Sequence, residues 1–120
     1  MTKPRNKGSI GIDIAETSRF KKILSASAAH QLTKLFSDEE ILYCRSFKDA
    51  ATHFAGHFAA KEAASKALGT QMYPFAELEI KHSKGGVPEV WLRRGKVNKK
   101  LPLRLSISHT KTTAVAVAIW

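Results

Sequence analysis

The chain has 120 residues, with 20 Lys or Arg against 10 Asp or Glu, and its formal net charge at pH 7 is +10. This length suits one domain rather than two, and the charge indicates an acidic partner, which could be nucleic acid, an anionic membrane, a polyphosphate ligand or an acidic protein. The single cysteine, Cys44, excludes an internal disulfide framework and a cysteine-rich zinc site. No stretch approaches the ~20 apolar residues of a membrane span, and no apolar run follows the basic N-terminus as it does in a signal peptide. We therefore expect a cytoplasmic protein with no membrane partner.

The N-terminal part of the chain is predicted to form a strand. Residues 1–8 are expected to be a basic tail, and one domain is expected to cover residues 9–120. Residues 9–14 alternate strictly, with three isoleucines on one face, which predicts a strand whose isoleucine face is buried. Asp13 lies on the other face. Because aspartate is a poor strand former, Asp13 either starts a turn or is a carboxylate placed for function.

Three helices are predicted before the middle of the chain. Thr17 or Ser18 is a candidate N-cap for the first helix. Residues 28–35 are predicted to form a second, short helix. The third begins at Ser37, because Ser37 and Glu40 have the spacing of a capping box.

A long helix over residues 47–68 is predicted to be the centre of the fold. Its apolar stripe contains Phe47, Ala51, Phe54, Ala55 and Phe58. Glu62 falls on the same stripe one turn later, and Lys66 follows one further turn along. Taken alone, these two residues could form an i,i+4 ion pair on a solvated face, which contributes about 0.2–0.5 kcal/mol. The stripe argues against that interpretation, because an ionised group in a core is costly unless it is paired or binds a metal.

The C-terminal half of the chain has the pattern of antiparallel strands. Alternating segments occur at residues 76–82, 90–92, 103–108 and 114–120, with a turn at 83–86 and a basic loop at 93–100. Alanines line one face of the last segment, which indicates close packing against the central helix or against another subunit. One strand, a block of helices and a set of strands together predict an α+β fold, in which one antiparallel sheet packs on the long central helix.

Asp13 and Glu62 are candidates to converge on a metal ion. Mg²⁺ prefers oxygen ligands from one or two carboxylates, with water and substrate phosphates completing its octahedron. Lys66 could pair with a phosphate or take part in proton transfer. His109 follows an alternating segment and could place an imidazole near the same ligand, although a surface turn histidine would show the same pattern.

Two segments carry a resemblance to a known family. Residues 10–14, Ile-Gly-Ile-Asp-Ile, and residues 58–67, Phe-Ala-Ala-Lys-Glu-Ala-Ala-Ser-Lys-Ala, resemble the two-part signature of the 4′-phosphopantetheinyl transferases, and most closely that of the small holo-acyl-carrier-protein synthase type. Further matching positions are Arg19, Phe36 to Glu40, Gly86-Val87-Pro88 and Ser106 to Thr110. Neither segment is specific alone, but together the matches run in order along almost the whole chain.

The resemblance implies an enzyme that moves the 4′-phosphopantetheine arm of coenzyme A to a serine of an acyl carrier protein and releases adenosine 3′,5′-bisphosphate. It implies a catalytic set of Asp13, Glu62 and Lys66. In this set Asp13 and Glu62 hold Mg²⁺, with Mn²⁺ left open, Lys66 lies near the phosphates, and Glu62 activates the serine directly or through water. The positions that match the coenzyme A site of the family are His57, Lys61, Ser65, Gly86, Pro88 and His109.

The resemblance also implies partners. Arg19 and Lys22 match the surface that receives the acidic carrier protein. Family members of this size are homotrimers with sites between adjacent subunits, which would suit the alanine-lined last strand. The sequence leaves open whether the carrier protein belongs to a fatty-acid, polyketide or other pathway.

His57 departs from the family pattern, which commonly has arginine directly before the Phe-Ala-Ala-Lys-Glu run. Histidine is mostly neutral at pH 7 and has no bidentate fork of donors. If this position touches a phosphate of coenzyme A, we expect the affinity to be weaker or more dependent on pH.

The main alternative is a basic α+β module that binds nucleic acid, since such a module accounts for the net charge. Asp13 and Glu62 would repel a phosphate backbone, however, and the strands lack an exposed aromatic set for stacking on bases, so nucleic acid is not the expected partner. A second alternative is a homologue that binds carrier protein but has lost activity. The intact residues Asp13, Glu62 and Lys66 argue against it.

Overall fold

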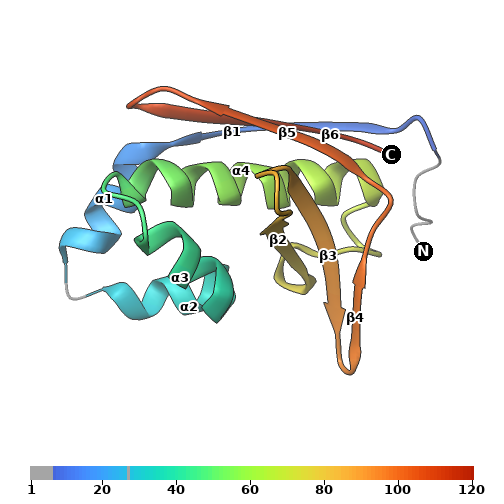
Figure 1. Ribbon diagram of the computed structural model, residues 1–120, viewed down its shortest axis with the longest axis horizontal. Coiled ribbons are helices and arrows are strands. Elements are labelled where there is room, and N and C mark those ends of the chain that lie inside the picture. The colour runs from blue at the N-terminus through green and yellow to red at the C-terminus, as the bar shows by residue number, and fades with distance from the viewer. Residues whose placement is uncertain (1–6, 27) are drawn as a thin grey trace.

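The computed structural model describes residues 7–26 and 28–120 (Figure 1). In chain order the elements are β1 (Ile10–Glu16), α1 (Thr17–Ser25), the 3₁₀ turn η1 (Ala29–Gln31), α2 (Leu32–Leu35), α3 (Asp38–Arg45), α4 (Ala50–Leu68), the 3₁₀ turn η2 (Phe75–Glu77), β2 (Leu78–His82), β3 (Pro88–Arg94), β4 (Val97–Lys100), β5 (Arg104–His109) and β6 (Thr113–Ile119). A strand, a block of helices and a run of strands follow one another, which confirms the predicted α+β class.

The strands form two antiparallel sheets of three strands each. Sheet A has the order β1–β6–β5, and sheet B has the order β2–β3–β4. Figure 1 shows α4 lying along sheet A, with α1, α2 and α3 below one end of α4 and sheet B below the other. The long helix is therefore the central layer, in contact with both sheets and with α1 and α3.

Two sheets are present where one was predicted, because the chain crosses from one sheet to the other after β4. Leu101 and Leu103 are buried, and the Leu101 N–H donates to the Val90 carbonyl oxygen at 2.8 Å. Pro102 between them has no amide N–H with which to continue a ladder. This anchored crossover ends sheet B and delivers the chain to β5 of sheet A.

The central helix is apolar around most of its circumference, as expected for a helix that is enclosed on all sides. It begins at Ala50 rather than at the predicted Phe47. Phe47 belongs to the turn after α3, where its N–H donates to the Cys44 carbonyl oxygen at 3.3 Å. On the side of α1 and α2, four phenylalanine rings pack with centroids 5.1–6.4 Å apart and hold these helices against α4; they are Phe20, Phe36, Phe54 and Phe58.

The isoleucine face of β1 is exposed, so the prediction that this face is buried is wrong. The exposed fractions of Ile10, Ile12 and Ile14 are 55%, 60% and 68%. On the neighbouring strand β6 the same outer face carries β-branched residues, Val115, Val117 and Ile119, which pair with the isoleucines. The alternating pattern identified a two-faced strand correctly, but hydrophobicity alone indicated the wrong face as the inner one.

On β1 and β6 the inner face of sheet A consists mainly of glycine and alanine because α4 lies very close to these two strands. A β-carbon on Gly11 would lie 2.0 Å from the carbonyl oxygen of Ala63 and 2.8 Å from the amide nitrogen of Ala67. The alanines of β6 are fully buried on this same face. Of the two surfaces predicted for them, the central helix is therefore the one that they contact within the chain.

Capping residues were predicted for the starts of α1 and α3, and only the prediction for α3 is confirmed. The capping box of α3 is confirmed, because the Ser37 N–H donates to the Glu40 carboxylate at 2.9 Å and the Glu40 N–H donates to the Ser37 hydroxyl at 3.2 Å. Neither predicted residue caps α1. Glu16 has the N-cap position, and the Thr17 hydroxyl donates instead to the Lys111 carbonyl oxygen at 2.7 Å. A tertiary contact has replaced the local cap.

Three further predictions concern the second helix, the N-terminal tail and membrane-spanning segments. The helix predicted over residues 28–35 is the η1 turn followed by the short α2. The predicted tail at residues 1–8 falls almost wholly outside the described residues, so the domain boundary at residue 9 stays a prediction. Within the described ranges, no helix combines the length and apolar character required to cross a bilayer.

The close approach at Gly11 predicts a large effect of adding one methyl group there. We expect Gly11→Ala to destabilise the protein by about 1–3 kcal/mol, because the new β-carbon collides with helix backbone that has no room to move. The matched control is Gly85→Ala, whose β-carbon has nothing within 4 Å and should leave stability nearly unchanged. Thermal unfolding at one protein concentration measures both. Equal melting temperatures for the two variants would contradict the close packing of α4 on sheet A.

Candidate active site

Asp13, Glu62 and Lys66 come together where β1 runs along α4. Asp13 follows Gly11 by two residues and so projects from the inner face of β1. The Lys66 ammonium lies 3.2 Å from Asp13 Oδ1 and 3.1 Å from the Ile12 carbonyl oxygen. Glu62 precedes Lys66 by one helical turn and is half-buried. Lys66 therefore reaches across to the neighbouring strand and is not only a helix-surface partner of Glu62.

The pKa of Glu62 depends on the charges of the other residues in this group. Partial burial and then the negative charge of Asp13 raise the pKa of Glu62, while the positive charges of Lys66 and Arg19 oppose that rise. Two carboxylates therefore share a space in which their mutual repulsion is only partly compensated. Such a pair on a partly exposed surface is typical of a site that receives a cation.

A divalent cation fits this arrangement better than a metal held wholly by protein. In the part of the chain that the structure describes, no three His, Cys, Asp or Glu side chains are grouped to hold a metal ion. Asp13 and Glu62 are two carboxylates that repel each other. Such a pair would suit Mg²⁺, which binds through one or two carboxylates and takes its other ligands from water and phosphates. The residues present are thus compatible with the predicted ion.

Arg19 lies beside this group on α1. Its guanidinium stacks over the Phe58 ring at 4.7 Å and lies 5.5 Å from the Phe20 ring. This stacking fixes the side chain near Glu62, to which its charge extends. Lys22, the other predicted partner residue, is exposed in the last turn of α1. The two basic residues predicted to receive a carrier protein therefore lie on one short helix next to the carboxylates.

Four of the six residues predicted to bind coenzyme A line one cavity on a different side of α4. The cavity has a volume of about 270 Å³. Its lining includes His57, Gly86, Pro88 and His109. It is closed by Tyr43 of α3, by the last residue of β2 and by the inner face of β5. The structure thus brings together segments that are more than 50 residues apart in the sequence.

Two further histidines in this cavity were not predicted. His53 and His82 line it together with His57 and His109. The sequence carried one usable signal, since His53 and His57 have the i,i+4 spacing that places two side chains on the same face of a helix. No sequence signal pointed to His82, because it reaches the cavity only through the packing of sheet B against α4.

Lys61 and Ser65 do not face this cavity. Lys61 is 2% exposed, and its ammonium donates to the Leu35 carbonyl oxygen at 2.7 Å and to Glu40 Oε1 at 3.1 Å. The Ser65 hydroxyl donates to the Tyr73 carbonyl oxygen at 2.6 Å and so ties the loop after α4 to the helix. Both side chains are engaged in internal contacts, and their predicted contact with coenzyme A stays a prediction.

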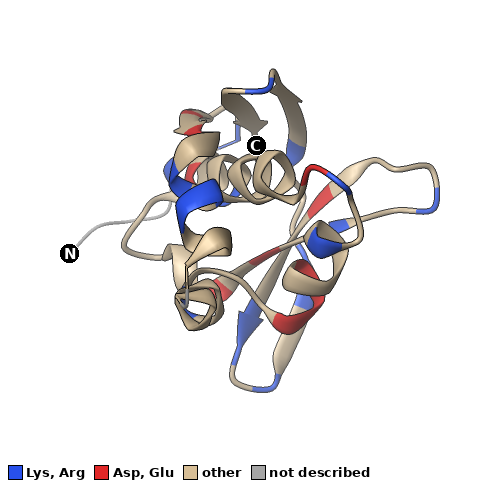
Figure 2. Ribbon diagram, turned by 90° about the vertical axis from the view of Figure 1, so that its left-hand side faces the viewer, with Lys and Arg blue, Asp and Glu red and all other residues tan. Residues whose placement is uncertain are grey.

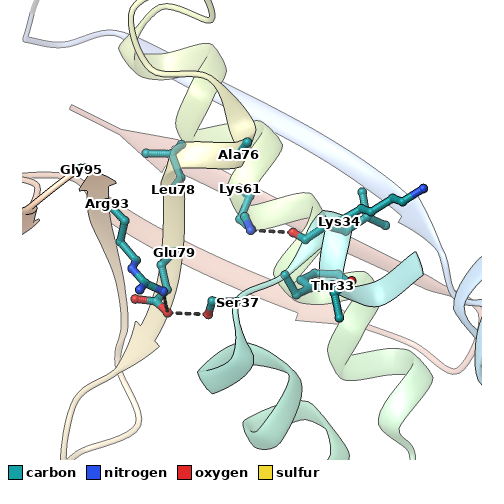
Figure 3. Close-up of a pocket in the computed structure, with 11 residues that line it drawn as sticks. Thr33, Lys34, Ser37, Lys61, Ala76, Leu78, Glu79, Arg93 and Gly95 are labelled. Carbon is teal, nitrogen blue, oxygen red and sulfur yellow. Dashed lines mark hydrogen bonds and ion pairs between the residues drawn. The ribbon is translucent and has the colours of Figure 1, made fainter. Parts of the chain in front are cut away.

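A second cavity, of about 350 Å³, adjoins Lys61. Figure 3 shows Lys61, Ser37, Glu79 and Arg93 around it. The Ser37 hydroxyl donates to the Glu79 carboxylate, which also forms an ion pair with Arg93 at 3.2 Å. These contacts join the start of α3 to sheet B, and they pair two of the charged groups of this cavity, Glu79 and Arg93, with each other.

Comparison with known proteins places the chain in a family. It matches the sequence model of the 4′-phosphopantetheinyl transferase superfamily over residues 9–118. It is 43% identical to a holo-[acyl-carrier-protein] synthase of Chlamydia caviae over 117 residues, covering 92% of this chain and 93% of that protein. It is 41% identical to the synthase of the same name from Thermoanaerobacter sp. strain X514, with coverages of 92% and 84%.

A solved structure agrees with the sequence matches. The fold is similar to that of a holo-(acyl-carrier-protein) synthase from Bacillus anthracis str. Ames in complex with CoA (3′,5′-ADP), with a TM-score of 0.73, 32% identity and coverages of 92% and 93%. Residues 9–118, which match the family model, include Asp13, Glu62 and Lys66. The chain belongs to the 4′-phosphopantetheinyl transferase superfamily.

Proposed function

We propose that the protein is a holo-[acyl-carrier-protein] synthase, which transfers 4′-phosphopantetheine from coenzyme A to a serine of an apo acyl carrier protein. The observation that carries this proposal is the convergence of Asp13, Glu62 and Lys66, with Arg19 beside them, in a chain that belongs to the transferase superfamily. In the reaction the serine oxygen forms a bond to the phosphorus next to pantetheine. The bond between that phosphorus and the bridging oxygen breaks, and adenosine 3′,5′-bisphosphate leaves.

Transfer at phosphorus requires charge neutralisation and in-line positioning more than covalent chemistry by the protein. Lys66 supplies a positive charge whose position is set by Asp13 and by the Ile12 carbonyl oxygen. Glu62 is the candidate to accept the serine proton, directly or through water. The nucleophile belongs to the carrier protein, so the enzyme needs no Ser-His-Asp arrangement of its own.

Asp13 and Glu62 are the residues that would hold Mg²⁺ in this proposal. When bound, the ion would neutralise negative charge on the pyrophosphate. Carboxylate oxygens as donors and the small number of protein ligands suit Mg²⁺, and Mn²⁺, which takes the same donors, could bind the same residues.

The acidic carrier protein would dock at α1, next to the carboxylates. Figure 2 faces the α1 end of the molecule and shows Lys and Arg positions on the helices there as well as on strands at either side. Arg19 and Lys22 are the proposed contacts on α1. The net charge of +10 would increase the rate of encounter with an acidic partner. Both substrates are made inside cells, and a cytoplasmic location follows from this proposal.

A homotrimer with sites between subunits is also proposed, on two grounds. The outer face of β1 and β6 carries six β-branched residues, of which the four isoleucines are exposed and the two valines half-buried, and such an apolar face on a soluble protein marks an interface. The residues are Ile10, Ile12, Ile14, Val115, Val117 and Ile119. In addition, the helix positions of His57 and Glu62 differ by five residues, which is about 140° around the axis. A neighbouring subunit would be needed to bring the histidine cavity opposite the carboxylates.

Incubation of an apo acyl carrier protein with this protein, coenzyme A and Mg²⁺ tests the activity directly. Intact mass spectrometry should show a carrier mass gain of ~340 Da, the mass of the arm, and EDTA should abolish it. Glu62→Gln should lower the rate by about 10²–10³-fold, because it removes a charged group from the reacting centre. The matched control Glu39→Gln changes an exposed glutamate of α3 and should leave the rate unchanged. A folded wild-type protein that modifies no apo carrier would overturn the proposal.

Arg19→Glu tests where the carrier protein docks. We expect the KM for the carrier to rise about tenfold or more, while the KM for coenzyme A stays within about twofold, since a reversed charge at α1 repels the acidic partner. Lys21→Glu is the control, because it makes the same change in net charge from another face of the same helix. Steady-state kinetics with each substrate varied give both constants. Equal losses for the two substrates would show that Arg19 does not belong to a carrier-specific surface.

The oligomeric state is tested by Ile12→Asp, a change at the centre of the exposed β-branched face. We expect wild type to have about three times the subunit mass of 13.3 kDa, and Ile12→Asp to be a monomer, because a buried unpaired carboxylate opposes association. Leu42→Asp is the control, since Leu42 is 76% exposed on α3, away from sheet A. Analytical ultracentrifugation measures the masses. A trimeric Ile12→Asp protein would place the interface elsewhere.

A further inference from the structure

The histidine cavity has an unusual lining for a chain with so many basic residues. Four of the five histidines line it, from α4, β2 and β5, and among the residues that the structure describes no Lys, Arg, Asp or Glu does. The histidines are His53, His57, His82 and His109. Any positive charge that these lining residues supply must therefore reside on an imidazole ring.

Two of these rings contact each other directly. His57 Nε2 lies 3.0 Å from His82 Nε2, so one of the two nitrogens carries a proton and the other accepts it. His57 is 2% exposed, and Tyr43 stacks on both rings, with centroids 5.3 Å from His57 and 4.2 Å from His82. The pair is thus held in place and has little freedom to turn away.

The other nitrogen of His57 faces a carboxylate. His57 Nδ1 is buried and has no hydrogen-bond partner within residues 7–26 and 28–120, and its neighbour is Glu40 Oε2 at 3.4 Å. Burial would raise the pKa of Glu40, but contacts with His57, Lys61 and the Ser37 N–H outweigh it, and the pKa is lowered. Glu40 is therefore ionised at neutral pH. A bare nitrogen lone pair next to this carboxylate would be repelled, so a proton on His57 Nδ1 is favoured.

The line from Glu40 through His57 to His82 has three positions for a proton, whereas two neutral imidazole rings carry only two N–H protons. One proton belongs between Glu40 and His57, and one lies between the two Nε2 atoms. The remaining nitrogen of His82 can donate to an acceptor, either the backbone of Gly86, whose contact raises the pKa of His82, or an anion in the cavity. Two neutral imidazoles supply two N–H groups. Filling all three positions requires one imidazolium shared by the pair.

Without an anion in the cavity, the groups around His57 and His82 disfavour the third proton that the imidazolium requires. Burial first, and then the charge of His57, lower the pKa of His82. Burial and the neighbouring His109 lower the pKa of His53. Glu89 on β3 acts in the opposite direction on His82. The other ionisable or charged groups facing the pair are Tyr43, Glu39 and Lys81 near His82, and Lys61 beyond Glu40.

We propose that a phosphate group of coenzyme A binds in this cavity against a single imidazolium shared by His57 and His82, so that binding takes up one proton. The inference rests on the proposed function, and it names the groups that recognise the phosphate in a chain that has His57 rather than arginine. His82 is the phosphate-recognition residue. His57 is a positioning residue, because it orients His82 and connects it to Glu40.

The sign of the pH dependence follows from the charges. Without a ligand the pKa of His82 lies below its ordinary value of 6.5, and a bound phosphate would raise it. The protonated form is therefore stabilised by the anion, and affinity decreases as pH rises above about 6.5, by up to about tenfold per pH unit for one linked proton. Phosphate keeps its second negative charge in this range, because its own pKa is about 6.

Isothermal titration calorimetry with adenosine 3′,5′-bisphosphate and Mg²⁺ tests the inference on the full chain. Titrations between about pH 6.5 and 8.5, each in two buffers of different ionisation enthalpy, give the dissociation constant and the number of protons taken up. For wild type we expect uptake approaching one proton and a dissociation constant that rises by up to about tenfold per pH unit. His82→Gln should bind with little pH dependence, at the weak affinity that wild type has at high pH.

Two variants separate charge from packing. His82→Arg should restore tight binding without pH dependence, because arginine keeps its charge throughout this range. His30→Gln, at an exposed histidine of η1, should behave as wild type. A wild-type affinity that is flat from pH 6.5 to 8.5, or an unchanged pH profile in His82→Gln, would overturn the shared imidazolium. If the carrier protein is still modified in that case, only this inference fails, whereas absence of both binding and transfer removes the proposed function as well.

Discussion

The contact between the glycine and alanine face of sheet A and the helix α4 is the constraint on which the rest of the structure depends. The helix backbone lies where the β-carbon of any larger residue at Gly11 would be. This spacing brings β1 close enough for Asp13 to meet Lys66 at 3.2 Å. A sheet with ordinary aliphatic residues on its inner face would stand ≈ 10 Å from its neighbour, and the carboxylates would no longer share one space. The close packing of sheet A on α4 is therefore what brings the residues of the site together.

A helix enclosed on all sides can present different chemistry in each direction. Consecutive residues differ by about 100° around α4, so Lys61 points to the buried pair with Glu40 while Glu62 points to the partly exposed carboxylate site. His57, one turn before Lys61, lies on the same side of the helix as Lys61 and contacts both Glu40 and His82. Glu40 thus links the internal ion pair to the histidine cavity. Breaking a buried pair of this kind leaves an uncompensated charge, which is typically destabilising by about 3–5 kcal/mol.

In the proposed trimer the exposed β-branched face would connect assembly to activity. Within one chain the carboxylates and the histidine cavity lie on different sides of α4, and the proposed second subunit would let one ligand contact both. The same sheet that packs its small residues inward is left with its large residues outward, where another copy of the chain is the proposed cover. The requirement for close packing inside the subunit thus leaves the apolar surface on which the proposed association would depend.

The sequence by itself determined the α+β class, the capping box of α3, the long central helix and, through two short segments, the family. These features depend on local patterns: alternation, helical periodicity, cap spacing and residue identity at a few positions. The sequence misjudged the face of β1, since the rule that isoleucine is buried fails when an alanine-rich helix selects the smallest residues. It also missed His53, although its i,i+4 spacing from His57 was a usable signal, and His82, which joins His57 only after sheet B packs on α4. Which side of a strand is inside, whether Thr17 caps its helix, and which histidines share a proton depend on what lies opposite each residue, and only the tertiary structure decided that.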